Sequence, residues 1–312
     1  MKRYIYFIIF LIVILLKNVY AEMILDLQEP IIEFPSIENY SLQGFTTTDK
    51  YLFMVLNGFD DTKSMIKVYD LNTFKQIKSY EYASLGHAND VTYNINNKMI
   101  YVLAGGGSKL LFEFDSNDFK YVRTIELELP GRSITYIDDS DSYAIRTVST
   151  GFRLNKEFEL YNKMPFIVGM NIRKDLGRQG WTYYKKNIYY SNWSWIRLGG
   201  DGSNVIFVYS MDGENIETYY TEKNIGEIED IAFFNNKMIL GFNGYDDKIK
   251  FYMIDVPEIT NSNKEFIDIN NNDNINNVKN YKFNYMYVIL SLAGIILVIF
   301  IFKIIKNTLD KS

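Results

Sequence analysis

Short alternations of hydrophobic and polar residues, separated by turn residues, run from about residue 22 to residue 257. A period of two indicates antiparallel β-strands, and helical periodicity is missing from this part of the sequence. Two distant stretches are versions of one another: Met-Val-Leu-Asn-Gly-Phe-Asp-Asp at residues 54–61 and Leu-Gly-Phe-Asn-Gly-Tyr-Asp-Asp at residues 240–247. Asn57 and Asn243 are 186 positions apart, or four steps of about 46. A strand-rich period of this length is typical of a β-propeller.

Each repeat opens on a polar pair that is followed by a short strand. The pairs begin at five residues spaced 46, 43, 47 and 50 positions apart: Gln43, Asn89, Arg132, Gln179 and Glu229. A second, a third and usually a fourth strand follow each opening. We therefore predict an all-β propeller of about five four-stranded blades over residues 22–257. Residues 31–34 could pair with the last blade to close the ring, and residues 265–269 are a rival for the same place. A sixth, degenerate blade built from both ends is the alternative.

The N-terminus carries the parts of a secretion signal. Lys2 and Arg3 precede an apolar stretch at residues 4–16, and small residues occupy the −3 and −1 positions before a cleavage site that follows Ala21. Such a stretch is too short to span a hydrocarbon core of about 30 Å comfortably. We therefore predict a signal peptide at residues 1–21, with an uncleaved anchor as the alternative.

The C-terminus differs, because residues 285–302 are long enough for a membrane-spanning helix and contain no charge. Lys303 and Lys306 follow at once, as expected on the cytoplasmic side. Before it, the Asn-rich residues 258–284 are typical of a flexible stalk, and residues 303–312 would form a cytoplasmic tail. These patterns predict a single-pass type I protein of the cell membrane, with its domain outside the cytoplasm. A C-terminal helix buried in a soluble core is the alternative.

The charge and the cysteine content bear on the class of partner and on how the ring is closed. The net charge is −5 and the isoelectric point is near 5.2, whereas a nucleic-acid partner normally requires a basic face. We therefore expect no nucleic-acid partner. There is no cysteine, so the ring of an exported domain must be closed by strand pairing rather than by disulfides.

Propeller geometry gives the repeat openings a common location. The inner strand of every blade lines the central channel, and its first residues lie at one mouth of that channel. We call the five opening residues the first column. The residues that follow them form the second column: Gly44, Asp90, Ser133, Gly180 and Asp230. Converging polar groups, one from each blade, are what a small ligand or a metal ion requires. The alternative is that they only solvate the channel.

One blade opening has a more specific counterpart. Residues 86–93 (Gly-His-Ala-Asn-Asp-Val-Thr-Tyr) followed by residues 98–102 (Lys-Met-Ile-Tyr-Val) resemble the blade opening of exported bacterial propellers, including gluconolactonase-like ones. The resemblance implies a divalent cation such as calcium, bound by carboxylates and amides at the blade openings. Its candidate ligands here are Asn89, Asp90, Glu229 and Asp230. Gln43, Gln179 and Arg132 depart from that pattern, since the enzymes favour Glu and Asn there and Arg132 adds a positive charge.

Two further features concern aromatic and imidazole side chains. Trp193 and Trp195 share one face of a strand, because they are two positions apart. Exposed, they would form a platform on which a sugar stacks; buried, they would fill the gap between blades. His87 is the only histidine, which is too few for a His-rich zinc site or for a triad with spare partners.

Two classes of function remain. In the first, a membrane-anchored propeller at the cell surface binds a glycan, peptide or protein ligand at its channel mouth or loops. In the second, it is a metal-dependent hydrolase of the lactonase type, with a metal-bound water as nucleophile. The sequence favours the first, because no pair of acid and base residues is recognisable and the charges of the first column are mixed.

Overall fold

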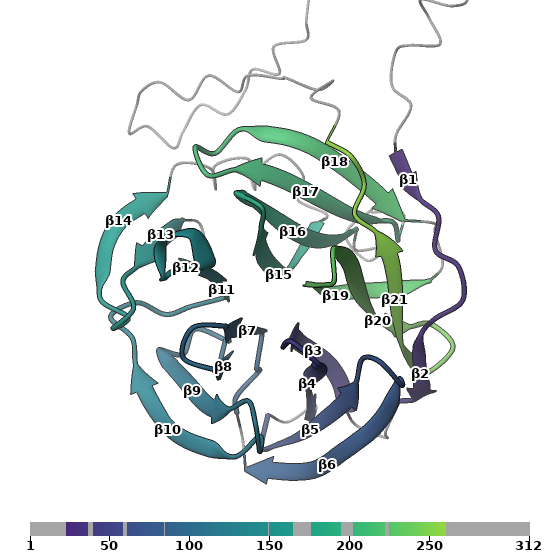
Figure 1. The fold of residues 1–312 in the computed structure, drawn as a ribbon, viewed down its shortest axis with the longest axis horizontal. Coiled ribbons are helices and arrows are strands. Elements are labelled where there is room, and N and C mark those ends of the chain that lie inside the picture. Colours follow the sequence, from purple (N-terminus) through teal and green to yellow (C-terminus); the bar gives the residue numbers. More distant parts are fainter. Residues whose placement is uncertain are drawn as a thin grey trace, which may run out of the picture. The chain divides into compact units, whose positions relative to one another are not determined.

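The computed structural model describes residues 23–36, 40–58, 61–83, 85–148, 150–164, 176–194, 202–221 and 225–259. Within these residues the chain forms five β-sheets, which are the blades of a propeller arranged around a central axis (Figure 1). The fold is therefore an all-β propeller with five blades, as the repeat predicts.

Each blade is a meander whose first strand lies innermost. Blade 1 consists of β3 (Tyr40–Thr47), β4 (Tyr51–Gly58), β5 (Lys63–Asp70) and β6 (Lys75–Ala83). Blade 2 consists of β7 (Asp90–Asn94), β8 (Met99–Leu103), β9 (Leu110–Asp115) and β10 (Tyr121–Glu126). Blade 3 consists of β11 (Ser133–Ile137), the 3₁₀ turn η1 (Asp138–Ser140), β12 (Ser142–Arg146), β13 (Gly151–Leu154) and β14 (Leu160–Met164).

The last two blades take their outermost strands from the N-terminal segment. Blade 4 consists of β15 (Leu176–Tyr184), β16 (Asn187–Ser194), β17 (Asn204–Ser210) and β18 (Asn215–Thr221), followed by β1 (Met23–Leu25). Blade 5 consists of β19 (Gly226–Phe234), β20 (Lys237–Gly244) and β21 (Lys248–Asp255), followed by β2 (Ile32–Pro35). The antiparallel pairing of β2 with β21 confirms that residues 31–34 complete the last blade. Their rival, residues 265–269, lies outside the described residues.

The ring closes through its inner strands and through its first and last blades. Neighbouring inner strands contact each other in the order β3, β7, β11, β15, β19 and back to β3, as Figure 1 shows around the axis. The N-terminal segment first adds β1 to blade 4, where it pairs in parallel with β18, and then completes blade 5 with β2. This double attachment fastens the ring without a disulfide.

Strand patterns follow from each strand's place in its blade. The second strand of blade 1, β4, is buried on both faces and is therefore continuously apolar at residues 52–56. The outermost strand, β6, alternates between half-buried and exposed residues because only one of its faces packs against the next blade.

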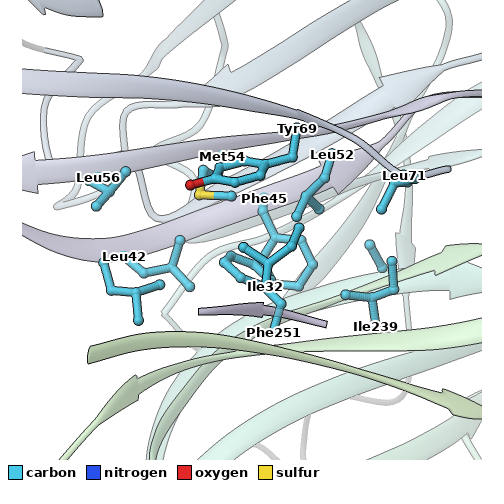
Figure 2. Close-up of a cluster of buried hydrophobic side chains, with 12 residues drawn as sticks. Ile32, Leu42, Phe45, Leu52, Met54, Leu56, Tyr69, Leu71, Ile239 and Phe251 are labelled. Atoms are coloured by element: carbon cyan, nitrogen blue, oxygen red, sulfur yellow. The ribbon is translucent and has the colours of Figure 1, made fainter. Parts of the chain in front are cut away.

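The hydrophobic core lies between the blades. Figure 2 shows the cluster between blades 5 and 1, where the Phe45 and Phe251 rings meet edge to face with 5.0 Å between their centroids. Trp181 is only 1% exposed and belongs to the cluster between blades 3 and 4. Burial at these seams stabilises the ring by about 25 cal/mol for each Å² of apolar surface removed from water.

The predicted signal peptide (1–21), the membrane-spanning helix (285–302), the tail (303–312) and nearly all of the stalk (258–284) lie outside the described residues. In the part of the chain that the structure describes, no helix is long and apolar enough to cross a membrane. The topology therefore stays a prediction.

Candidate functional site

Three first-column residues occupy β-bulges. Gln43, Gln179 and Glu229 each lie where the register between the first and second strands of a blade shifts. In blade 1, for example, the residues on both sides of Gln43 pair with β4, but Gln43 itself does not. A bulge takes a residue out of the ladder and re-aims its side chain. Asn89 and Arg132 instead directly precede the first residues of β7 and β11.

The first column is mostly accessible. Gln43, Asn89, Arg132 and Gln179 are half-buried, whereas Glu229 is only 5% exposed. We call the end of the ring where these residues lie the mouth face. Four of its five blades therefore present a polar side chain that remains within reach of solvent.

The second column is occupied by contacts between blades. Asp90 and Asp230 are fully buried. Asp90 Oδ2 accepts the backbone N–H of Ile134 in blade 3 at 3.0 Å and that of Trp181 in blade 4 at 3.4 Å. Asp230 Oδ2 accepts the backbone N–H of Phe45 in blade 1 at 3.1 Å. These carboxyl groups join the inner strands to one another and do not line an open channel.

Asp90 and Asp230 also interact with each other near the axis. Burial raises the pKa of Asp90 to about 7, against the opposing effect of its hydrogen bond with Asp230 and of the backbone N–H groups. Burial and the adjacent Asp90 charge raise the pKa of Asp230 well above its usual value. Two carboxyl groups that interact directly and are both buried away from water titrate as a pair. At neutral pH the pair therefore retains at least part of a shared proton.

Two glycines of the second column make room for this pair. A Cβ atom on Gly180 would lie 2.0 Å from Asp230 Oδ1, and one on Gly44 would lie 2.9 Å from the Cα atom of Asp90. Both positions are too close for any side chain, so the backbone can approach only because glycine stands there.

The seam between blades 3 and 4 carries a buried guanidinium. Arg146, at the end of β12, is 2% exposed. Its Nε and Nη2 atoms donate to Ser133 Oγ at 3.1 and 2.7 Å, and Nη2 also donates to the Gln179 backbone oxygen at 3.1 Å. The guanidinium lies 5.2 Å from the centre of the Tyr190 ring. Arg146 thus joins the second column of blade 3 to the first column of blade 4.

Two more arginines stand beside Arg146. Arg132 directly precedes Ser133, the ladder partner of Arg146, and its backbone N–H donates to the Arg146 backbone oxygen at 2.6 Å. Arg178 extends from blade 4 towards blade 3 and donates from Nη1 to the Val148 backbone oxygen at 2.6 Å. Burial lowers the pKa of Arg146, and the charges of Arg178 and Arg132 contribute to the same shift. We call these three residues the arginine cluster.

Blade 5 gives the mouth face two acidic side chains, Glu227 and Glu229. Gln179 Nε2 donates to Glu227 Oε1 at 2.5 Å, and Asn243 Nδ2 donates to Glu229 Oε1 at 2.6 Å. Burial, and after it the Glu227 charge, raises the pKa of Glu229 well above its usual value. Asn243 also accepts the Leu42 N–H at 2.9 Å, so the repeated asparagine of the sequence joins blade 5 to blade 1.

The predicted aromatic platform is only partly described. Trp193 is half-buried at the end of β16, where it packs at the edge of the cluster between blades 4 and 5. Its Nε1 atom donates to the hydroxyl of Tyr245, which is 48% exposed. Trp195 lies outside the described residues. An aromatic pair, Trp193 with Tyr245, therefore borders the mouth face.

The predicted cation ligands do not point to a common centre. Asn89 Oδ1 is buried without a hydrogen-bond partner and lies against Gly105, where a Cβ atom would be 2.1 Å away. Asp90 and Asp230 bind backbone N–H groups, and Glu229 binds Asn243. Among the described residues, no three acidic, histidine or cysteine side chains are grouped as a metal site. A cation at these residues stays a prediction.

Sequence analysis did not single out Arg146, Arg178, Glu227 or Tyr245. Arg146 ends an apolar strand and pairs across the ladder with Ser133 of the second column. That position gives no signal until the strand pairing is known. The bulges did leave a signal, because a glycine inside a strand pattern, as at Gly44 and Gly180, is typical of a bulge or of a close backbone approach.

Comparisons with known proteins add little to this site. No protein-family model matches the sequence, and no curated protein sequence matches it. Among solved structures, Kuenenia stuttgartiensis hydrazine synthase is 12% identical with a TM-score of 0.39, over 65% of this chain and 62% of that one. The RRP9 WD40 repeats are 9% identical with a TM-score of 0.42, over 76% and 88% of the two chains. The Neurospora crassa Pan2 WD40 domain is 7% identical with a TM-score of 0.41, over 76% and 98%.

Proposed function

We propose that this chain is an interaction module that binds its ligand at the mouth face. The observation that carries the proposal is the shared placement of Gln43, Gln179 and Glu229 in β-bulges of three blades. A bulge interrupts the ladder, and bulges are over-represented beside functional sites because they re-aim a side chain. The three bulges take Gln43, Gln179 and Glu229 out of the ladders, while the second column joins the blades.

The surroundings of the first column support binding rather than chemistry. Tryptophan, tyrosine and arginine supply most of the binding energy in protein interfaces, and Trp193, Tyr245 and Arg132 all border this face. The amides of Gln43 and Gln179 donate and accept hydrogen bonds, which suits a glycan, a peptide or a protein ligand equally.

The test is a search for ligands of the full-length chain on glycan and peptide arrays, followed by titration of each hit. Gln43→Ala and Gln179→Ala should each weaken the binding of a true ligand by about tenfold or more, because each removes a polar contact that the ligand buries. Gln76→Ala is the matched control, because Gln76 is exposed on β6, the outermost strand of blade 1. Hits that bind all three variants as tightly as the wild type would contradict a site at the mouth face.

We further propose that the propeller is presented outside the cytoplasm, after removal of residues 1–21, and is anchored by residues 285–302. The order of the two hydrophobic segments and the basic residues after the second one support this topology. Protease added to intact cells should then remove the propeller and leave a small membrane-bound fragment. Complete protection of the propeller would contradict this part of the proposal.

A cation-dependent hydrolase of the lactonase type is the second candidate. The buried Asn89 Oδ1 atom without a partner is the one observation in its favour, since a buried acceptor normally finds a donor or a cation. Calcium titration of the purified full-length chain, followed by calorimetry, tests it. Stoichiometric binding that Asn89→Ala abolishes would favour the enzyme, and an absence of binding would remove this candidate.

A further inference from the structure

A groove with a volume of about 360 Å³ lies between the outer parts of blades 1 and 2. Blade 1 supplies one wall from β6, and blade 2 supplies the other from the β9–β10 turn and the start of β10. The lining residues are Lys78, Tyr80, Tyr82, Phe119, Lys120 and Tyr121. Figure 1 shows β6 and β10 on the outer rim of the ring, so this concave surface is separate from the first column on the inner strands.

Aromatic rings form most of the groove, and contacts with the blades hold them in place. The centre of the Tyr82 ring lies 5.6 Å from that of Phe114 and 6.0 Å from that of Tyr121. The Tyr80 hydroxyl donates to the Phe119 backbone oxygen, which joins the two walls. Tyr121 nevertheless remains 42% exposed. An apolar side chain that covered these rings would remove their exposed surface from water, which is favourable.

The corresponding place in blade 4 is already filled by a fifth strand. There β1 pairs with β18, and Leu25 of β1 is only 4% exposed in the cluster between blades 4 and 5. Tyr219 of β18 belongs to the same cluster and is fully buried. In the described part of the chain no strand lies beyond β6, and Tyr80 and Tyr82 stay half-buried. Blade 1 therefore has an open fifth-strand position above an aromatic seam.

The edge of β6 can accept a strand along its length. It is nine residues long, and an edge strand leaves the N–H and C=O groups of every second residue without a partner in its own sheet. The register shift near Ile77 lies at one end of the strand, so Lys78 to Ala83 form a regular stretch. A partner strand can pair with that stretch while its alternate side chains enter the groove.

The charge of this edge selects the partner. Among the described residues, Lys75 and Lys78 form no ion pair, and Lys78 Nζ donates only to the neutral Asp118 backbone oxygen. Other charged groups nearby are paired: Lys120 with Asp118 at 2.6 Å and Glu81 with Lys63 at 3.8 Å. Two copies of β6 side by side would bring their lysines together, which opposes self-pairing. An acidic strand is favoured instead.

We propose that the groove binds an extended, acidic segment of a partner protein, which joins blade 1 as a fifth strand beside β6. Large apolar side chains of the segment pack on Tyr80 and Tyr82, and an aspartate or glutamate lies against Lys78. In strand addition the backbone pairing supplies affinity, while the pockets for alternate side chains supply specificity. The proposal does not depend on the mouth face, so each of the two sites can fail without the other.

The probe is the fluorescein-labelled heptapeptide Asp-Ser-Leu-Ser-Leu-Ser-Asp, which carries acids and leucines on one face of a strand and reads the same in both directions. Its binding to the full-length chain is followed by fluorescence anisotropy. The peptide Asp-Leu-Ser-Ser-Ser-Leu-Asp has the same composition but places its leucines on the face opposite to the acids. It should bind about tenfold or more weakly. Equal binding of the two peptides, or binding of neither, would overturn the proposal.

Backbone pairing has a test of its own. Alternate N–H groups of a strand point to opposite edges, so N-methylation of the two leucines and N-methylation of the three serines block different edges of the probe. One methylated peptide should lose about tenfold or more in affinity, and the other should bind like the probe. Equal effects of the two methylations would exclude strand addition.

Substitutions locate the peptide on the ring. Lys78→Gln should weaken the probe about threefold, the effect of an exposed ion pair. Lys163→Gln is the matched control, because Lys163 is exposed on β14, the outermost strand of blade 3. An unchanged affinity in Lys78→Gln would overturn the acidic partner, and a loss of affinity in Gln43→Ala would move the peptide to the mouth face. A dimer of the full-length chain that competes with the probe would assign the edge to a second copy.

Discussion

Asp230→Asn should weaken a dependence of stability on pH that the buried carboxyl pair creates, because it removes one of the two groups whose pKa the fold raises. The ordinary pKa of the Asp90 carboxyl is 3.8, and the fold raises it to about 7. Between these values the folded chain binds a proton that the unfolded chain has released, so its free energy of unfolding falls as pH rises. One pKa unit corresponds to about 1.36 kcal/mol, so Asp90 alone gives a loss of about 3 kcal/mol between pH 5 and pH 8, and Asp230, whose pKa is also raised, adds to this loss.

The substitution replaces the shared proton by a permanent donor. The amide introduced at position 230 would offer its N–H to the Asp90 carboxylate. Its oxygen would still accept one of the two backbone N–H groups that Asp230 binds, from Phe45 and Ile231. The loss of one hydrogen-bond acceptor lowers the free energy of unfolding by about 1 kcal/mol. At the same time the repulsion between two neighbouring carboxylates is removed. We therefore expect the variant to be about 1 kcal/mol less stable than the wild type at pH 5 and at least as stable at pH 8.

Urea unfolding, followed by tryptophan fluorescence from pH 5 to pH 8, measures both curves. Asp246→Asn is the control, because its hydrogen bond and ion pair with Lys250 lower the pKa of Asp246. Asp246 therefore contributes stability that is lost only as pH falls below its ordinary pKa, which leaves the slope in this window unchanged. A wild-type stability that rises from pH 5 to pH 8, or an Asp230→Asn variant that keeps the wild-type slope, would refute the reasoning.

Three further substitutions test the packing of the inner strands. Trp181→Ala should lower the free energy of unfolding by about 3–5 kcal/mol in urea, and a loss below about 1 kcal/mol would contradict its burial. Gly180→Ala should lower the free energy of unfolding by about 1–3 kcal/mol, because the new Cβ would meet Asp230. An unchanged free energy of unfolding would show that the backbone of the inner strand can shift to make room. The Tyr136 N–H donates to Thr92 Oγ1 at 2.8 Å. Thr92→Val should therefore lower the free energy of unfolding by about 1–3 kcal/mol and speed hydrogen exchange of the Tyr136 amide. Unchanged exchange there would exclude that bond.

The repeat predicted the fold because it depends on strand pairing within each unit. Asn57 and Asn243 lie at corresponding places in β4 and β20, the second strands of blades 1 and 5, as four steps of the period require. Trp181 directly follows the second column, and it is buried between blades 3 and 4. Residues 31–34 competed with residues 265–269 on equal terms, because each has strand character and only the closed ring distinguishes them.

The site was harder to predict, because it depends on the exact register. The sequence placed Asp90 and Asp230 beside the first column as ring residues, whereas the structure buries both between blades. Glu229 was expected at an accessible mouth and is also buried, beneath Asn243. A shift of one residue in a strand turns a side chain to the opposite face, and alternation in the sequence does not show where a bulge introduces that shift.

The bulges have a consequence for how this surface can change. In a regular strand, neighbouring residues point to opposite faces, so the identity of one position constrains the packing of the residues two places away. At the bulges, Gln43 and Gln179 lie outside the ladder, while Gly44 and Gly180 maintain the close contacts with the aspartates. The mouth face can therefore accept different first-column residues without altering the second column. Glu229 is the exception, because its burial beside Asn243 couples the first column of blade 5 to the closure of the ring.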